Sequence, residues 1–290
     1  MNPTAKSFIL DLLSTLRGGA MPVRALIAAA EHFDIADNSI RVALARLLAE
    51  GRVARDDRGQ YALGVQAEAM RRQVTTWRTL DDRVVRWDGG WIGVHRSTRR
   101  PRLTGPEVRR RARALRFLGF RTLEPGFNVR PDNLRGGVTE MRAQLHALGL
   151  EAEGLVFVVD QFDPATEERA LALWDVAALR AGYRRSISML AQSERRLPQL
   201  AERHAMTEAF RLGGQVIRQL VLDPLLPEPL VPAAERTALL DAMRRYDRLG
   251  RACWAGFMRA SGAPHRHAPA DTRMAHEEDW LRTAAVGGTR

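Results

Sequence analysis

Residues 36–63 predict a helix followed by a β-hairpin, and this segment constrains the fold more than any other part of the chain. The apolar residues that recur at helical spacing and form one packing face are Ile40, Leu44, Leu47 and Leu48. Asp37 or Asn38 is expected to cap the helix, and Gly51 can end it. Segments 52–55 and 60–63 then predict two short strands around the turn at 56–59.

The face of this helix opposite its apolar face carries small side chains and is flanked by arginines. A helix that enters the major groove of DNA needs small side chains at the closest approach and long hydrogen-bonding side chains beside them. The residues predicted to bind DNA are Asn38, Ser39, Arg41, Val42, Ala45 and Arg46 on the helix, with Arg55 and Arg58 on or near the hairpin tip. The alternative is a small helical domain whose hairpin contacts no DNA.

Two earlier segments complete this first domain. Residues 7–16 and 23–33 both show apolar periodicity of the helical kind. Residues 1–66 therefore predict three helices and a wing, which is the arrangement of a winged helix-turn-helix domain.

The composition indicates a chain with more than one buried core. The chain has 290 residues, 45% of them hydrophobic, and this length favours two or three domains. It has no run of eighteen apolar residues, and its first residues lack the pattern of a signal peptide. We therefore expect a cytoplasmic protein that does not enter a membrane. The single Cys253 excludes an intramolecular disulfide and any site built from several thiolates, and it is expected to be a buried core thiol.

Positive charge is concentrated in the middle of the chain. The net charge is +11, yet residues 1–66 carry eight basic and seven acidic side chains. Residues 71–116 hold fourteen arginines and four acidic residues, which is a surplus of ten positive charges. Such a block can neutralise DNA phosphates or attract an anionic small ligand such as a nucleotide or coenzyme A. The charge pattern alone leaves both alternatives open, and many of these arginines are expected to be solvated.

A cycle of strands and helices follows the first domain. Residues 65–86 predict a polar helical connector with Trp77 and Leu80 as packing points. The predicted strands are 91–95, 121–123, 127–129 and 155–159, and the predicted helices are 106–118 and 132–148. The resulting order, β-α-β-β-α-β, is that of a ferredoxin-like unit, and a fold of this kind assigns no activity by itself.

The last third of the chain is predicted to be helical. Apolar spacing near 3.6 marks helices at 166–182, 183–194, 200–221 and 233–260, and a proline-rich elbow at 223–232 interrupts them. The predicted divisions of this α+β chain are a winged helix-turn-helix domain at 1–66, a connector at 67–86, a ferredoxin-like domain at 87–163, a helical C-terminal dimerisation and effector domain at 164–262, and a mobile tail at 263–290.

Three strings together give the chain a family resemblance. They are Ile-Arg-Val-Ala-Leu-Ala-Arg-Leu at 40–47 followed by Gly51, Trp-Asp-Gly-Gly-Trp at 87–91, and Leu-Asp-Pro-Leu-Leu-Pro at 222–227. In order and spacing they resemble the PaaX family of bacterial transcriptional repressors over roughly residues 5–260. The resemblance implies a winged helix, a Cas2-like ferredoxin fold, a helical C-terminal domain, and a homodimer released from DNA by an acyl-CoA such as phenylacetyl-CoA. The chain departs from the family at 232–236, where family members commonly carry a tryptophan-containing segment.

Two groups of residues are candidates for binding this effector. The arginines of the loop after strand 91–95, which would contact the phosphates of an acyl-CoA, are Arg96, Arg99, Arg100 and Arg102. The same arginines could instead clamp DNA or face solvent. The residues that could line an acyl pocket are Trp174, Tyr183, Arg184 and Phe210, although aromatic residues at helical spacing also form ordinary core.

A dimer follows independently from the geometry of DNA. One recognition helix reads only a few base pairs, whereas two helices related by a two-fold axis read half-sites about one helical turn apart, or a multiple of it. We therefore expect double-stranded DNA with an inverted-repeat operator as the partner.

Two other classes of function remain as alternatives. A metal-dependent nuclease needs clustered carboxylates, for which Asp88, Asp160 and Asp163 are the candidates, although each also suits a turn or a helix cap. The common catalytic motifs are absent, so we expect no enzyme, no metal site and no cofactor. His265 and His267 in the tail are expected to be solvated. The second alternative is a helical scaffold whose winged helix binds protein.

Overall fold

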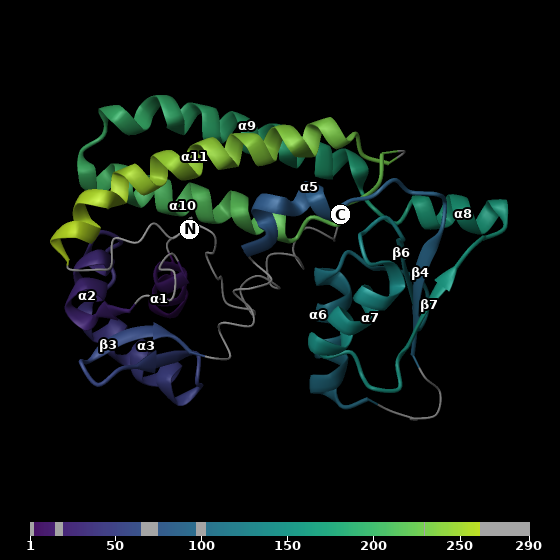
Figure 1. Cartoon of the computed structure of the whole chain (residues 1–290), viewed down its shortest axis with the longest axis horizontal. Coiled ribbons are helices and arrows are strands. Elements are labelled where there is room, and N and C mark those ends of the chain that lie inside the picture. The colour runs from purple at the N-terminus through teal and green to yellow at the C-terminus, as the bar shows by residue number, and fades with distance from the viewer. Residues whose placement is uncertain (1–2, 15–19, 65–74, 97–102, 229, 262–290) are drawn as a thin grey trace. The chain divides into compact units, whose positions relative to one another are not determined.

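The computed structural model describes residues 3–14, 20–64, 75–96, 103–228 and 230–261 of an α+β chain (Figure 1). The chain divides into two compact units that are discontinuous in sequence. Unit 1 comprises Met1–Arg78, Ser186–Val221 and Leu239–Arg290, and unit 2 comprises Thr79–Arg185 and Leu222–Ala238. Within the described residues, no helix combines the length and apolar character needed to cross a membrane.

Unit 1 begins with three helices and a small antiparallel sheet. The helices are α1 (Ala5–Ser14), α2 (Val23–Glu31) and α3 (Asp37–Ala49), and the strands are β1 (Met21–Pro22), β2 (Val53–Arg55) and β3 (Gln60–Leu63). The sheet has the order β1-β3-β2, with β2 and β3 forming the predicted hairpin. The expected three helices and hairpin are therefore confirmed, and β1 is an additional strand that the sequence did not predict.

The cap of α3 differs from the expectation. Ala36 occupies the N-cap position and supplies no side-chain hydrogen bond, whereas Asp37 is the first helical residue. The Asp37 carboxylate instead lies along the helix, 2.7 Å from Nε of Arg41 one turn later. An acidic group in the first turn still interacts favourably with the positive end of the helix dipole.

The core of the N-terminal helices continues into the C-terminal helices of unit 1. These are α10 (Glu202–Val221) and the distal parts of α9 (Val176–Arg196) and α11 (Ala233–Ala260). The ring of Phe210 lies 5.6 Å from Phe8 and 5.0 Å from Phe33, and that of Trp254 lies 5.7 Å from Phe210. Figure 1 shows the yellow end of α11 beside α2. Cys253 is half-buried against this core rather than fully buried, and burial raises the pKa of its thiol.

Unit 2 contains a four-stranded antiparallel sheet. Its elements are β4 (Trp91–His95), α6 (Gly105–Phe117), β5 (Arg121–Glu124), β6 (Phe127–Pro131), α7 (Gly137–Ala147) and β7 (Leu155–Val159). The strand order in the sheet is β5-β6-β4-β7, and the elements follow one another in the predicted order β-α-β-β-α-β. Gly93 stands in the middle of β4 because a Cβ there would lie 2.9 Å from the rings of Phe127 and Phe157.

Helices lie on both sides of this sheet, but they cover only one side fully. Figure 1 shows α6 and α7 on one side, whereas α8 (Pro164–Leu171) lies on the other near one end of the strands, and Leu155 and Phe157 of β7 stay exposed. Trp91 is fully buried, donates to the Glu167 carboxylate of α8 at 3.0 Å, and lies 6.2 Å from Trp174. The helix α7 begins five residues later than predicted, because the backbone of Asn133 and Leu134 pairs with Val85 and Val84 instead.

The C-terminal helices differ from the expected pattern at one point. No break separates Gly182 from Tyr183, and α9 runs continuously from Val176 to Arg196. The interruption lies earlier, where α8 ends at Leu171 and the Asp175 carboxylate accepts a hydrogen bond from the backbone of Ala178 at 2.8 Å. The predicted connector contains η1 (Thr75–Thr79) and α5 (Leu80–Arg83), with Trp77 and Leu80 buried as expected, while its residues 67–74 lie outside the described residues. The tail residues His265 and His267 lie outside the described residues.

Candidate nucleic-acid interface

The helix α3 presents its predicted outer face to solvent. Its buried residues are Ile40, Ala43, Leu44 and Leu47. Its exposed residues include all six that were predicted to bind DNA, namely Asn38, Ser39, Arg41, Val42, Ala45 and Arg46. Val42 keeps 43% of its surface exposed although it is apolar.

The side chain of Arg41 is held at this surface by Asp37. Arg41 Nε lies 2.7 Å from Asp37 Oδ1, and its terminal nitrogen donates to Oδ2 at 3.2 Å. Both side chains are more than half exposed, so this pair contributes little to stability. Two of the five N–H donors of Arg41 point toward Asp37, and the remaining edge of the guanidinium can donate to other acceptors.

The hairpin tip carries the two predicted wing arginines in exposed positions. The Asp56 carboxylate accepts hydrogen bonds from the backbone of Arg58 at 3.0 Å and Gln60 at 2.7 Å, and Gly59 takes the left-handed φ of +74° that the turn requires. Arg55 lies 5.8 Å from the centre of the Tyr61 ring. The turn therefore fixes the backbone that carries Arg55 and Arg58, and both side chains are exposed.

Two glycines, one before and one after the hairpin, let the hairpin lie close to the end of α3. Gly51 has a φ of +65°, and Arg52 donates its N–H to Leu47 O at 2.9 Å, which closes the helix. A Cβ at Gly64 would lie 2.2 Å from the carbonyl oxygen of Gly51. The hairpin can therefore return against the end of α3 only without a side chain at position 64.

Helix α10 holds the turn between α2 and α3. Arg203 donates to Glu31 O at 3.0 Å and to the Asp34 carboxylate at 3.1 Å. Asp34 lies in the left-handed region with a φ of 58°, which an aspartate tolerates better than most residues. Arg211 places its guanidinium 5.6 Å from the ring centre of Phe33. Sequence reasoning missed these contacts, because no local pattern links residues about 170 positions apart.

The predicted effector residues do not form one cluster within the described residues. Arg99, Arg100 and Arg102 lie outside the described residues, and Arg96 is exposed. Trp174 is buried and donates its indole N–H to Gly119 O at 3.2 Å, whereas Arg184 is exposed and 3.9 Å from Glu235. The ring of Phe210 belongs to the core of unit 1.

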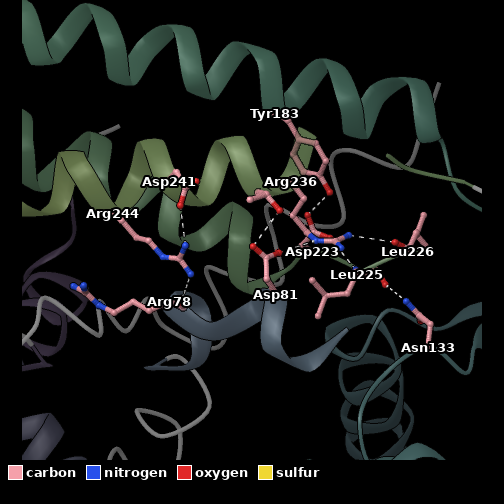
Figure 2. A network of polar contacts seen from close by, with 11 residues as sticks. Arg78, Asp81, Asn133, Tyr183, Asp223, Leu225, Leu226, Arg236, Asp241 and Arg244 are labelled. Atoms are coloured by element: carbon pink, nitrogen blue, oxygen red, sulfur yellow. Dashed lines mark hydrogen bonds and ion pairs between the residues drawn. The ribbon is translucent and has the colours of Figure 1, made fainter. Parts of the chain in front are cut away.

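Tyr183 and the proline-rich elbow form a buried polar network in unit 2 (Figure 2). The Tyr183 hydroxyl donates to the buried carboxylate of Asp223, which also accepts from the backbone N–H of Leu225 at 2.8 Å. Burial raises the pKa of Asp223, and burial beside this carboxylate raises that of Tyr183. Arg236, also buried, donates to Leu226 O at 3.2 Å.

Residues in and just after strand β6 also form hydrogen bonds with the proline-rich elbow. Leu225 has a φ of 52°, and its carbonyl accepts from the Asn133 amide at 2.6 Å. Arg130 donates to Asn133 at 3.1 Å and to Pro224 O at 3.4 Å, and complete burial lowers its pKa to about 9. The Leu-Asp-Pro-Leu-Leu-Pro string is therefore structural: it places its polar groups against partners that satisfy them.

Two of the three acidic residues considered for metal binding have other roles in the structure, and the third, Asp160, is exposed. Asp88 accepts from the backbone of Gly90 at 3.0 Å in a turn, and Asp163 caps α8 through Ala165 and Thr166, each at 3.1 Å. The described residues contain no group of three or more potential metal-ligating side chains.

The chain matches two family models. Residues 4–67 match the PaaX-like protein model, and residues 174–255 match the model of the PaaX-like protein C-terminal domain, together spanning half of the chain. Among solved structures, the uncharacterized protein Rv0674 from Mycobacterium tuberculosis is similar, with 22% identity and a TM-score of 0.56 over 86% of this chain and 98% of that chain. At this identity the likeness shows the fold alone. No curated protein matches the chain.

Proposed function

Because the chain belongs to the PaaX-like protein family, which implies a transcriptional regulator, we propose that it is a DNA-binding repressor whose α3 enters the major groove. The observation that carries the proposal is the exposure of the complete arginine-flanked face of α3 beside a hairpin with Arg55 and Arg58 near its tip. We regard the first domain as a winged helix and the sheet of unit 2 as ferredoxin-like.

DNA retardation and fluorescence anisotropy test this proposal. The probe is the DNA upstream of the protein's own gene, with a scrambled duplex of equal length as the non-specific reference. If Arg41 reads a base edge, Arg41→Ala weakens specific binding by about 1–3 kcal/mol and leaves non-specific binding nearly unchanged. Arg24→Ala, which removes an exposed arginine of α2, serves as the charge-matched control. Equal losses in both variants would contradict the assignment of Arg41.

A wing arginine is expected to behave differently from Arg41. Arg58 extends from the hairpin turn, where a phosphate contact is the expected role. Arg58→Ala should weaken specific and non-specific binding by similar factors and reduce the slope of log affinity against log salt by about one. A loss confined to the specific duplex would place Arg58 on a base instead.

The proposed assembly is a homodimer on an inverted-repeat operator. A closed two-fold dimer presents two copies of α3 to half-sites that are separated by whole helical turns. The proposed effector is an acyl-CoA resembling phenylacetyl-CoA, which lowers the affinity for the operator by preferring a state with wrongly spaced helices. Magnesium-dependent cleavage of the duplex would instead support a nuclease, and the absence of any interaction with DNA would favour a protein-binding scaffold.

A further inference from the structure

Helices α9 and α10 line a groove of about 650 Å³ within unit 1. This volume lies within the range of small-molecule sites. Met189, Leu200 and Leu212 are the apolar residues of its wall. The polar residues that complete the wall are Gln192, Ser193, Arg196, His204, Thr207, Glu208, Arg211 and Gln215.

The charges of this groove favour an anion. Its acidic residue, Glu208, is paired with Arg196 at 2.7 Å and accepts from the Ser193 hydroxyl at 2.5 Å. Arg211 instead places its guanidinium carbon 5.6 Å from the centre of the Phe33 ring. This cation–π contact occupies none of the guanidinium N–H donors. Arg211 can therefore donate to a carboxylate or phosphate in the groove while it keeps its contact with Phe33.

The wall of the groove also contacts the segment that leads into α3. Arg203, on the same helix as Arg211, holds Glu31 O and the Asp34 carboxylate at the turn before α3. Phe210 packs against both Phe8 and Phe33, in the same core as the buried face of α3. A ligand that shifts α10 therefore also shifts this turn, because the helix and the turn share one closely packed core.

We propose that the groove between α9 and α10 binds the effector, an organic anion with an apolar body whose acidic group contacts Arg211. Binding shifts α10 against the turn at Asp34 and thereby changes the orientation of α3. The binding step stands independently of DNA, whereas the regulatory step rests on the proposed function.

Titration of the full chain with 8-anilinonaphthalene-1-sulfonate, a fluorescent apolar anion, tests the binding step. We expect saturable binding that phenylacetyl-CoA displaces, with a loss of at least about tenfold in Arg211→Gln and in Leu212→Trp, which fills the groove. Two control variants should retain the affinity for the dye. Arg195→Gln changes an exposed arginine close to the groove but outside its lining, and Phe157→Ser changes the sheet of unit 2. Unchanged dye binding in Arg211→Gln and Leu212→Trp, or loss of dye binding in Phe157→Ser, would refute the groove as the binding site. Failure of phenylacetyl-CoA to displace the dye overturns the assignment of an acyl-CoA to the groove.

DNA affinity with and without saturating phenylacetyl-CoA tests the regulatory step. Arg203→Gln removes a side chain outside the groove lining, so this variant should still bind the dye but show a smaller change in DNA affinity than the wild type. A ligand that displaces the dye without changing DNA affinity, or a full response in Arg203→Gln, overturns the regulatory step. A chain that binds no DNA refutes the proposed function, while the dye titration still decides the groove.

Discussion

At the scale of single residues, Asp223 predicts a specific dependence of stability on pH. Burial raises its pKa above the ordinary value of 3.8. Between the pKa of the unfolded state and that of the folded state, Asp223 therefore keeps its proton in the folded chain and releases it in the unfolded chain. The stability contributed by protonated Asp223 is therefore full below pH 3.8 and is lost as pH rises through the folded-state pKa. Asp223→Asn stays neutral, so its free energy of unfolding should improve relative to wild type as pH rises.

Urea unfolding at a series of pH values from about 4.5 to 8 measures this difference. Asp57→Asn, at the exposed hairpin turn, is the control and should give a difference that does not follow the same trend. A constant difference between wild type and Asp223→Asn across the series would show that the carboxyl stays ionised in the folded state.

Residue exposure on α3 could be predicted from sequence because helical periodicity alone determines which side chains lie opposite a buried face. The partners of those residues could not. Asp37 was expected to cap α3 but pairs with Arg41, since the two geometries compete for the same carboxylate. The roles of Trp174 and Tyr183 as effector ligands stay predictions, and both side chains are buried in unit 2.

At the scale of elements, the junction between α3 and its hairpin predicts a stability effect at Gly64. A methyl group there would lie 2.2 Å from a backbone oxygen, which cannot rotate away. Gly64→Ala should therefore destabilise the protein by about 1–3 kcal/mol and weaken DNA binding by displacing the hairpin. Gly105→Ala is the control, because its Cβ would meet only the far end of the Arg109 side chain at 3.4 Å.

Thermal unfolding and anisotropy measurements on both variants decide this prediction. A melting temperature of Gly64→Ala equal to that of Gly105→Ala would mean that the hairpin adjusts without strain.

The order and type of elements in unit 2 were predictable from alternating strands and helical spacing. The continuity of α9 through Gly182 was not, because a glycine within a helix costs only about 1 kcal/mol and packing can offset it.

At the scale of the whole chain, periodicity could not predict that residues far apart in sequence share one core. Phe8 of α1 and Phe33, which follows α2, need Phe210 and Trp254 as packing partners. Proximity of this kind depends on tertiary structure, for which sequence spacing carries no signal. The division of the chain at residue 66 stays a prediction, and the core of unit 1 extends across that position.

This shared core predicts that residues 1–66 alone do not form a stable domain. Without α10 and α11, the rings of Phe8 and Phe33 lose contacts at 5.6 and 5.0 Å with Phe210, and their apolar surface becomes exposed to water. Circular dichroism of this fragment should show a broad or absent melting transition. In the full chain, Phe210→Ala should reduce the free energy of unfolding by about 3–5 kcal/mol and weaken DNA binding. A fragment that melts cooperatively at the temperature of the full chain would show that the first domain folds independently of its neighbours.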